Sequence, residues 1–128
     1  MRVEPLIVVA DVEKSSIFYQ RLLGCTSGHG GPDFEMLMSD ERLLLQLHAR
    51  QTAHAHPGLV AEGSQLGNGV ALWFRTDDFD AAVERIGDLD AEVVAGPLVN
   101  PNAHHDEIWI RDLDGYLVVV SDNFGDAD

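Results

Sequence analysis

The sequence carries one pattern of strand and helix signals twice, and this duplication constrains the fold more than any other feature. A short apolar run rich in β-branched residues, 5–10 in the first half and 70–74 in the second, predicts a strand in each half. A helix N-cap follows each run, and the two caps, Asp11 and Asp78, are 67 positions apart (78 − 11). An interval this long exceeds a solenoid repeat and indicates a duplicated supersecondary block.

Further strand signals follow each predicted helix. Residues 35–40 parallel residues 107–112, because both segments alternate in polarity and end at a turn. Another strand leaves each turn, over 43–48 in the first half and 116–121 in the second. Each half therefore has the order βαβββ, and we predict an α+β fold with eight strands.

The length of 128 residues fits a single domain with a core of its own. We predict one domain over 1–128. It consists of module one at 1–49, a linker at 50–68 that lacks hydrophobic periodicity, and module two at 69–123.

Charge and cysteine content narrow the partners and the compartment. The chain has 22 acidic and 8 basic residues and a formal net charge of −14. Such a surface repels the phosphates of nucleic acids and anionic membranes, so we expect neither as a partner. The single cysteine, Cys25, excludes an internal disulfide, and no apolar run is long enough for a membrane span or a signal-peptide core. We therefore expect a cytoplasmic protein.

Strand alternation sorts the side chains onto two faces of each predicted sheet. One face is apolar throughout and is expected to pack against the helix, as Leu43, Leu45 and Leu47 do in the strand 43–48. The opposite face holds a mixture of indole rings and polar groups, which is typical of a ligand cavity. Its members are Glu4, Gln46, His48, Trp73, Glu107 and Trp109. The alternative is a solvent-exposed sheet face with incidental aromatic residues.

The histidines leave several interpretations open. His48 is a candidate general base, since a histidine titrates near neutral pH, or else a hydrogen-bonded residue at a strand end. His104 and His105 precede Glu107 in a predicted loop, where they either are exposed or contribute to ligand binding at the pocket. Neither this pair nor the linker pair His54 and His56 has the spacing of a known zinc motif.

Two segments resemble known signatures. Residues 9–24, with the pair Phe18-Tyr19 and a closing Leu-Gly, resemble the first strand–helix signature of the vicinal oxygen chelate (glyoxalase/bleomycin-resistance/dioxygenase) superfamily. Residues 107–116 resemble its second signature, a hydrophobic strand that enters Asp-Pro-Asp-Gly, with Leu113 in place of the proline. The resemblance implies two βαβββ modules that form an incompletely closed eight-stranded barrel around a small-molecule pocket, and a homodimer.

The resemblance also implies positions for a divalent metal ion. Carried over by position, the ligand sites fall at Glu4, Ala71 and Val119 and on or near Gln46. Ala71 and Val119 offer no lone pair to a cation, so half of the ligand set is missing. We therefore expect no metal and no other cofactor, as in the metal-free branch of the superfamily.

We expect a protein that sequesters an aromatic or cationic small molecule. Trp73 and Trp109 supply stacking surface, and Glu4 and Glu107 supply complementary charge. The expected ligand-binding residues are Gln46, Trp73, Glu107, Trp109, His104 and His105. Alternatives are a metal-free enzyme that acts on a small carbonyl substrate with His48 or Glu4 as acid or base, a metal-dependent lyase or dioxygenase that uses the same two residues, and a decayed pocket.

Overall fold

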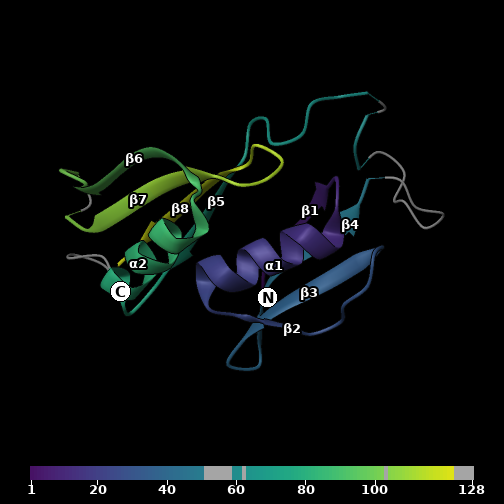
Figure 1. Ribbon diagram of the computed structural model, residues 1–128, viewed down its shortest axis with the longest axis horizontal. Helices are drawn as coiled ribbons and strands as arrows, with labels where there is room; N and C mark the ends of the chain where they lie inside the picture. Colours follow the sequence, from purple (N-terminus) through teal and green to yellow (C-terminus); the bar gives the residue numbers. More distant parts are fainter. Residues whose placement is uncertain (51–58, 62, 103, 123–128) are drawn as a thin grey trace. The chain divides into compact units, whose positions relative to one another are not determined.

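The computed structural model describes residues 1–50, 59–61, 63–102 and 104–122. The chain divides into two compact units, Met1–Leu66 and Gly67–Asp128 (Figure 1). Each unit has its own sheet and its own helix, so each is described by itself.

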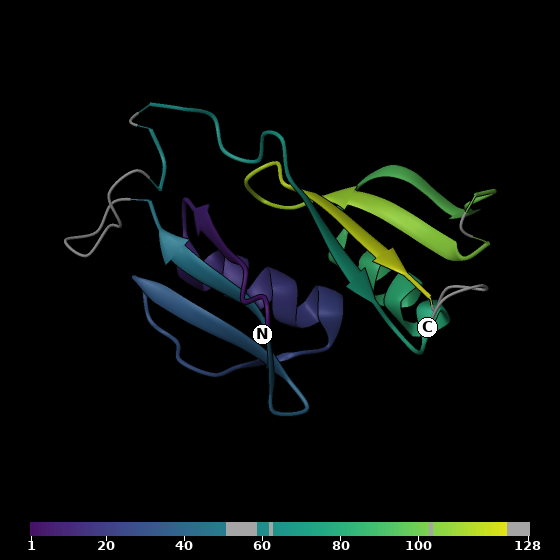
Figure 2. The ribbon, with the colours of Figure 1, turned by 180° about the vertical axis from the view of Figure 1, so that it is seen from behind.

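The first unit is a four-stranded sheet with one helix. Its elements are β1 (Leu6–Val9), α1 (Val12–Leu23), β2 (Thr26–Ser27), β3 (Phe34–Ser39) and β4 (Arg42–Ala49). The strands lie in the order β1-β4-β3-β2, with β1 parallel to β4 and the other pairs antiparallel (Figure 2). The parallel pair of β1 and β4, at one end of the sheet, is the consequence of the helical crossover that α1 provides.

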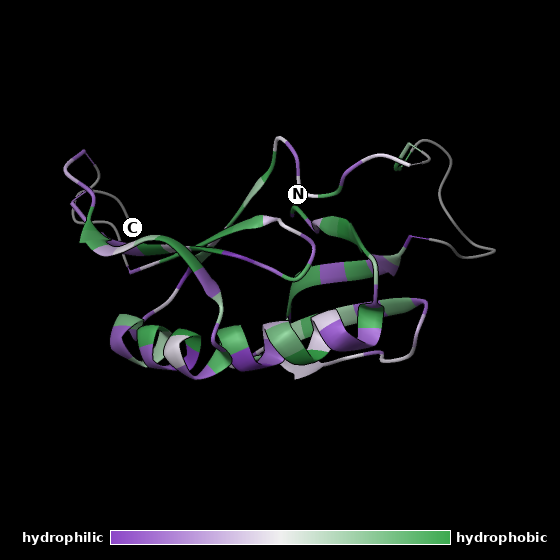
Figure 3. Cartoon of the chain, turned by 45° about the horizontal axis from the view of Figure 1, so that its top comes forward, coloured by the Kyte–Doolittle hydropathy of each residue, from purple (hydrophilic) through white to green (hydrophobic). Residues whose placement is uncertain are grey.

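Helix α1 has the caps that the sequence predicts. The Asp11 side chain accepts a hydrogen bond from the backbone N–H of Lys14 at 3.0 Å, and Gly24 ends the helix in the left-handed conformation with φ 66°. Hydrophobic and hydrophilic bands alternate along the helices (Figure 3). The apolar stripe of α1, which includes the fully buried Tyr19 and Leu22, packs on β3 and β4. This stripe and the sheet residues under it form the core of the first unit.

The second unit repeats the same order of elements. They are β5 (Ala71–Arg75), α2 (Phe79–Leu89), β6 (Glu92–Val99), β7 (Asp106–Arg111) and β8 (Leu117–Ser121). The strand order is β5-β8-β7-β6, with β5 parallel to β8. The predicted α+β architecture of two βαβββ modules is thus confirmed, and the eight strands form two open sheets and no closed barrel within the described part of the chain.

The helix side of the second sheet is apolar, as predicted. Asp78 caps α2 by accepting a hydrogen bond from the backbone N–H of Ala81 at 3.1 Å. The helix packs on β7 and β8 through Ala82 and Ile86. Five apolar residues of the sheet that are directed to this side are buried, namely Leu72, Ile108, Ile110, Val118 and Val120, while Phe74 on the same side of β5 is half-buried. The remaining side chains of the same strands therefore lie on the opposite face, which we call the open face.

The registers correct one predicted correspondence between the two halves. Leu6, Gln46 and Met36 are neighbours across the first sheet. The equivalent neighbours across the second sheet are Trp73, Val119 and Trp109. Phe34, and not Glu35, is therefore equivalent to Glu107, and the predicted match of 35–40 with 107–112 was wrong by one residue. A shift of one residue moves a side chain to the other face, so Glu35 lies on the helix side and Glu107 on the open face.

A β-bulge changes the placement of Leu43. Leu37 pairs with Leu45 while Met38 pairs with Leu43, so Leu44 has no partner on β3. We predicted Leu43 on the helix side together with Leu45 and Leu47. Leu45 and Leu47 are fully buried, whereas Leu43 is half-buried and lines a hollow on the surface.

The segment between the units is described only in part. Of the predicted linker 50–68, residues 51–58 and 62 lie outside the described residues, and with them His54 and His56. The backbone N–H of Arg50 donates to the carbonyl oxygen of Val9 at 3.2 Å, and its guanidinium donates to the carbonyl oxygen of Ser64. Among the described residues, no helix is long and apolar enough to cross a membrane.

Candidate functional site

The open face of the second sheet carries both tryptophans of the chain. Trp73 on β5, Val119 on β8 and Trp109 on β7 form one row across the sheet. In the next row Ser121 is the neighbour of Glu107. Strand alternation thus brings three of the predicted ligand-binding residues together on one face, as expected from their parity.

Glu107 is the centre of a buried hydrogen-bonded cluster on this face. Its carboxylate accepts hydrogen bonds from Nε2 of His105 at 2.6 Å, from Nε1 of Trp109 at 2.9 Å and from Nδ2 of Asn100 at 3.3 Å. The side chains of Glu107 and His105 are each only 1% exposed. We call Asn100, His105, Glu107 and Trp109 the Glu107 cluster.

The Glu107 cluster holds its carboxylate in the charged form. Burial by itself raises the pKa of a carboxyl group. At Glu107, the hydrogen bonds from His105, Trp109 and Asn100 and the attraction to His105 outweigh burial and lower the pKa below its usual value. Since a carboxylate only accepts hydrogen bonds, Nε2 of His105 carries a proton. The ionised carboxylate therefore lies at the N–H edge of the Trp109 indole ring.

The two indole rings are held by their N–H groups. Nε1 of Trp73 donates to Oγ of Ser121 at 2.9 Å, and the Trp73 ring meets the His105 ring edge-on, with centroids 5.8 Å apart. Trp73 is 46% exposed and Trp109 is half-buried. Because protein groups accept both indole N–H bonds, a ligand on this face meets the π surfaces of the rings.

The open face of the first sheet carries His48 and Gln46. His48 is 5% exposed, and its Nδ1 lies 2.7 Å from the carbonyl oxygen of Ala49. A carbonyl oxygen only accepts, so Nδ1 is the donor and Nε2 is the proton acceptor of the neutral ring. The ring of Phe34 packs edge-on against His48 with centroids 6.5 Å apart, and that of His29 packs against Phe34 at 5.2 Å.

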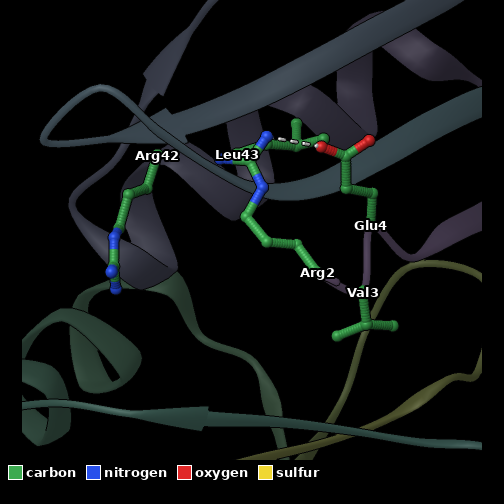
Figure 4. A pocket seen from close by; sticks show the side chains of 5 residues that line it. All are labelled: Arg2, Val3, Glu4, Arg42 and Leu43. Carbon is green, nitrogen blue, oxygen red and sulfur yellow. Dashed lines mark hydrogen bonds and ion pairs between the residues drawn. The ribbon is translucent and has the colours of Figure 1, made fainter.

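Glu4 lies just before β1, beside a hollow of about 310 Å³ that is lined by Arg2, Val3, Glu4, Arg42 and Leu43 (Figure 4). Its carboxylate accepts a hydrogen bond from Nη2 of Arg2 at 3.1 Å, and its side chain is 47% exposed. Nε2 of Gln46 donates to the backbone carbonyl of Glu4 at 3.2 Å. The Glu4 charge is thus compensated by Arg2, while Gln46 bonds to the backbone of Glu4.

His104 and His105 have different environments although they are adjacent. His104 is exposed, has a φ of 57°, and its backbone N–H donates to the carbonyl oxygen of Asn100 at 2.9 Å. His105 is buried against Glu107 and Trp73. Of this predicted pair, the structure brings only His105 into the cluster on the open face.

Sequence reasoning missed several members of these two faces. Ser121 has the strand parity of Val119, so alternation could have identified it, and Phe34 would have followed from the correct register of β3. Asn100 and His29 stand in loops, where no periodicity indicates which side chain turns toward the sheet.

The residues at the metal-ligand positions do not fit a metal ion. Ala71 and Val119 are hydrocarbon side chains, and Val119 is buried between the two tryptophans of its row. Glu4 is paired with Arg2. Within the described ranges, no group of three or more His, Cys, Asp or Glu side chains could hold a metal ion. The donor set therefore supports no chemistry that needs the ion as a Lewis acid.

Known structures share this fold. A lactoylglutathione lyase from Agrobacterium tumefaciens is 22% identical, with 96% of this chain and 93% of that chain covered and a TM-score of 0.70. A protein of unknown function from the same bacterium is 20% identical, with 96% and 94% covered and a TM-score of 0.79. The fosfomycin resistance protein FosX from Mesorhizobium loti is 13% identical, with 96% and 92% covered and a TM-score of 0.67. At these identities the likeness shows the fold alone.

No curated protein matches the sequence closely enough to count as a relative. The family model described as "Glyoxalase/Bleomycin resistance protein/Dioxygenase superfamily" matches residues 3–120, which is nearly the whole chain. With the duplicated βαβββ order and the two signature segments, this match establishes that the chain belongs to the glyoxalase/bleomycin-resistance/dioxygenase superfamily.

Proposed function

We propose that this protein binds and sequesters an aromatic, cationic small molecule without the help of a metal ion. The observation that carries the proposal is the pair of anchored indole rings on the open face of the second sheet, with the buried Glu107 carboxylate at the N–H edge of one of them. Rings that are fixed before the ligand arrives lose little conformational entropy on binding.

The charge of the site favours a cation over an anion. The π surface of tryptophan attracts a cation, with about 0.5–2 kcal/mol per contact. The Glu107 carboxylate adds to this attraction because it is ionised, and the net charge of −14 raises the local concentration of cations. The carboxylate is buried under its own donors, so it acts through its field and not through direct contact with the ligand.

A second candidate function is a metal-free enzyme in which His48 moves a proton on a small carbonyl compound. The contact of Nδ1 with the carbonyl oxygen of Ala49 supports it, because this contact makes Nε2 the basic nitrogen of the neutral ring. Glu4 is a poorer candidate for the same role, since its carboxylate is engaged by Arg2. The resemblance to the superfamily further supports a homodimer. The single cysteine supports a cytoplasmic location.

Dye binding tests the proposal. We expect proflavine, a planar cationic dye, to show saturable fluorescence anisotropy with the purified protein. Replacing Trp73 with alanine should weaken binding about tenfold, which corresponds to about 1.4 kcal/mol. Leu113→Ala is the matched control, because Leu113 is also an exposed apolar residue of the second unit but lies in the β7–β8 turn.

Equal affinities of the wild type, Trp73→Ala and Leu113→Ala would contradict a site at the tryptophans. Turnover of a carbonyl compound that is abolished in His48→Ala would instead support the enzyme.

A further inference from the structure

Glu35 occupies a position of the first sheet where a carboxylate is not needed for packing. It lies on the helix side of β3 and is 2% exposed. The equivalent residue of the second unit is Ile108, which fills the same place with hydrocarbon. A buried carboxylate is unfavourable unless several donors satisfy it, so its presence here calls for a reason beyond the core.

The donors to Glu35 come mainly from the segment 27–30. Oε1 accepts from the backbone N–H groups of His29 at 3.1 Å and Gly30 at 2.8 Å, as well as from that of Met36 at 2.9 Å. Oε2 accepts from Oγ of Ser27 at 2.7 Å and from Oγ of Ser16 on α1 at 2.7 Å. The carboxylate thus ties a glycine-containing loop to helix α1 and to strand β3.

The loop that Glu35 holds presents His29. The His29 ring is exposed and packs edge-on against Phe34, whose own ring packs on His48. Nδ1 of His29 lies 2.7 Å from the carbonyl oxygen of Gly30 and must be the donor. In the neutral ring, Nε2 is therefore a hydrogen-bond acceptor placed at the edge of an aromatic surface.

We propose that His29 determines ligand specificity on the open face of the first sheet and that Glu35 is its positioning residue. The ligand class is an aromatic molecule that bears an N–H or O–H donor, stacked near Phe34 with its donor on Nε2 of His29. This inference rests on the proposed binding function, because it specifies which aromatic ligands the protein prefers.

Two dyes separate the donor from the ring. Proflavine has two amino groups, while acridine orange has the same cationic ring with both amino groups fully methylated and so lacks those donors. We expect the wild type at pH 8 to bind proflavine at least fivefold more tightly than acridine orange. His29→Ala should remove this preference by weakening proflavine binding alone, whereas the preference should persist in Trp73→Ala. Leu113→Ala, which changes an exposed residue of the β7–β8 turn, is the control and should leave the preference unchanged.

Glu35→Gln tests the positioning role. This substitution should raise the amide hydrogen-exchange rates of His29 and Gly30 at least tenfold and reduce the preference for proflavine. The double variant Glu35→Gln with His29→Ala should show no further loss of this preference. A Glu35→Gln protein that loses stability but keeps the wild-type preference would show that Glu35 is only structural. Equal binding of both dyes by the wild type would overturn the inference but leave the proposed function standing, and binding of neither dye would overturn both.

Discussion

Replacing Glu35 with alanine is expected to lower the free energy of unfolding by about 3–5 kcal/mol, the range for removing one partner from a buried charged network. The substitution would leave the buried hydroxyl of Ser16 without its acceptor, together with the hydroxyl of Ser27 and the N–H groups of His29 and Gly30 in the loop at 27–30. Urea unfolding followed by far-ultraviolet circular dichroism measures the difference. Glu41→Gln, in the exposed β3–β4 turn, should change the free energy of unfolding by less than about 0.5 kcal/mol.

Glu35 also gives the stability a defined pH dependence. Burial alone raises the pKa of this carboxyl group, but the hydrogen bonds from Ser27, Ser16, Gly30 and His29 outweigh it and lower the pKa from 4.5 to about 2. A pKa depressed in the folded state stabilises the protein above the pKa of the unfolded state. The contribution, about 3 kcal/mol, is therefore fully present at pH 7 and is lost as the pH falls from about 4.5 to about 2. In Glu35→Gln this part of the destabilisation at acid pH should disappear. A stability that falls at low pH as steeply as in the wild type would contradict the hydrogen-bonded network around Glu35.

Replacing Glu107 with alanine is expected to lower the free energy of unfolding by about 2–4 kcal/mol. The His105 and Trp109 N–H groups and the Asn100 amide would lose their common acceptor, and one unsatisfied buried donor costs about 1–3 kcal/mol. The Trp109 ring would also lose its anchor. We therefore expect the tryptophan emission to shift to longer wavelength and the near-ultraviolet circular dichroism of the folded protein to weaken.

Glu92→Gln provides the comparison for Glu107, because it changes an exposed carboxylate at the start of β6 in the same unit. It should leave stability and emission as in the wild type. A Glu107→Ala protein with wild-type emission would mean that the carboxylate does not hold Trp109. Equal losses of stability in Glu107→Ala and Glu92→Gln would indicate that the change in net charge, and not the loss of the local hydrogen bonds, causes the effect.

Most of the fold could be predicted from the sequence because the signals that define it are local. The caps Asp11 and Asp78 and the apolar stripes behind them fix where each helix begins and which side it buries. Alternation correctly assigned Trp73, Glu107 and Trp109 to the open face, since Ile108 and Ile110 leave no doubt about the apolar side of β7.

The register of β3 could not be predicted in the same way. Phe34, Met36 and Met38 on one face are as apolar as a core requires, and the other face contains Glu35 as well as Leu37. The predicted match of 35–40 with 107–112 therefore set Glu35 against Glu107, and only the contacts of its carboxylate with α1 and with the loop at 27–30 place it on the helix side. The bulge that displaces Leu43 leaves no sequence signal of its own.

The candidate site depends on contacts that the sequence does not encode locally. The bond of Asn100 to Glu107 and that of Trp73 to Ser121 join residues from different elements or from loops, so their partners follow only from the folded sheet. For the same reason Glu4 was expected to supply charge for the ligand, although in the folded unit Arg2 compensates it.

Proflavine binding measured with and without divalent ions tests the central claim, metal-independent binding at the tryptophan face, most directly. The protein is dialysed against a chelator, and the dissociation constant is measured by anisotropy before and after addition of one equivalent of Zn²⁺, Ni²⁺, Mn²⁺ or Fe²⁺. Because Ala71 and Val119 offer no ligand atoms, we predict the same dissociation constant in every case, and a tenfold weaker one in Trp73→Ala throughout. Loss of dye binding on chelation, with recovery on addition of one of these ions, would contradict the claim.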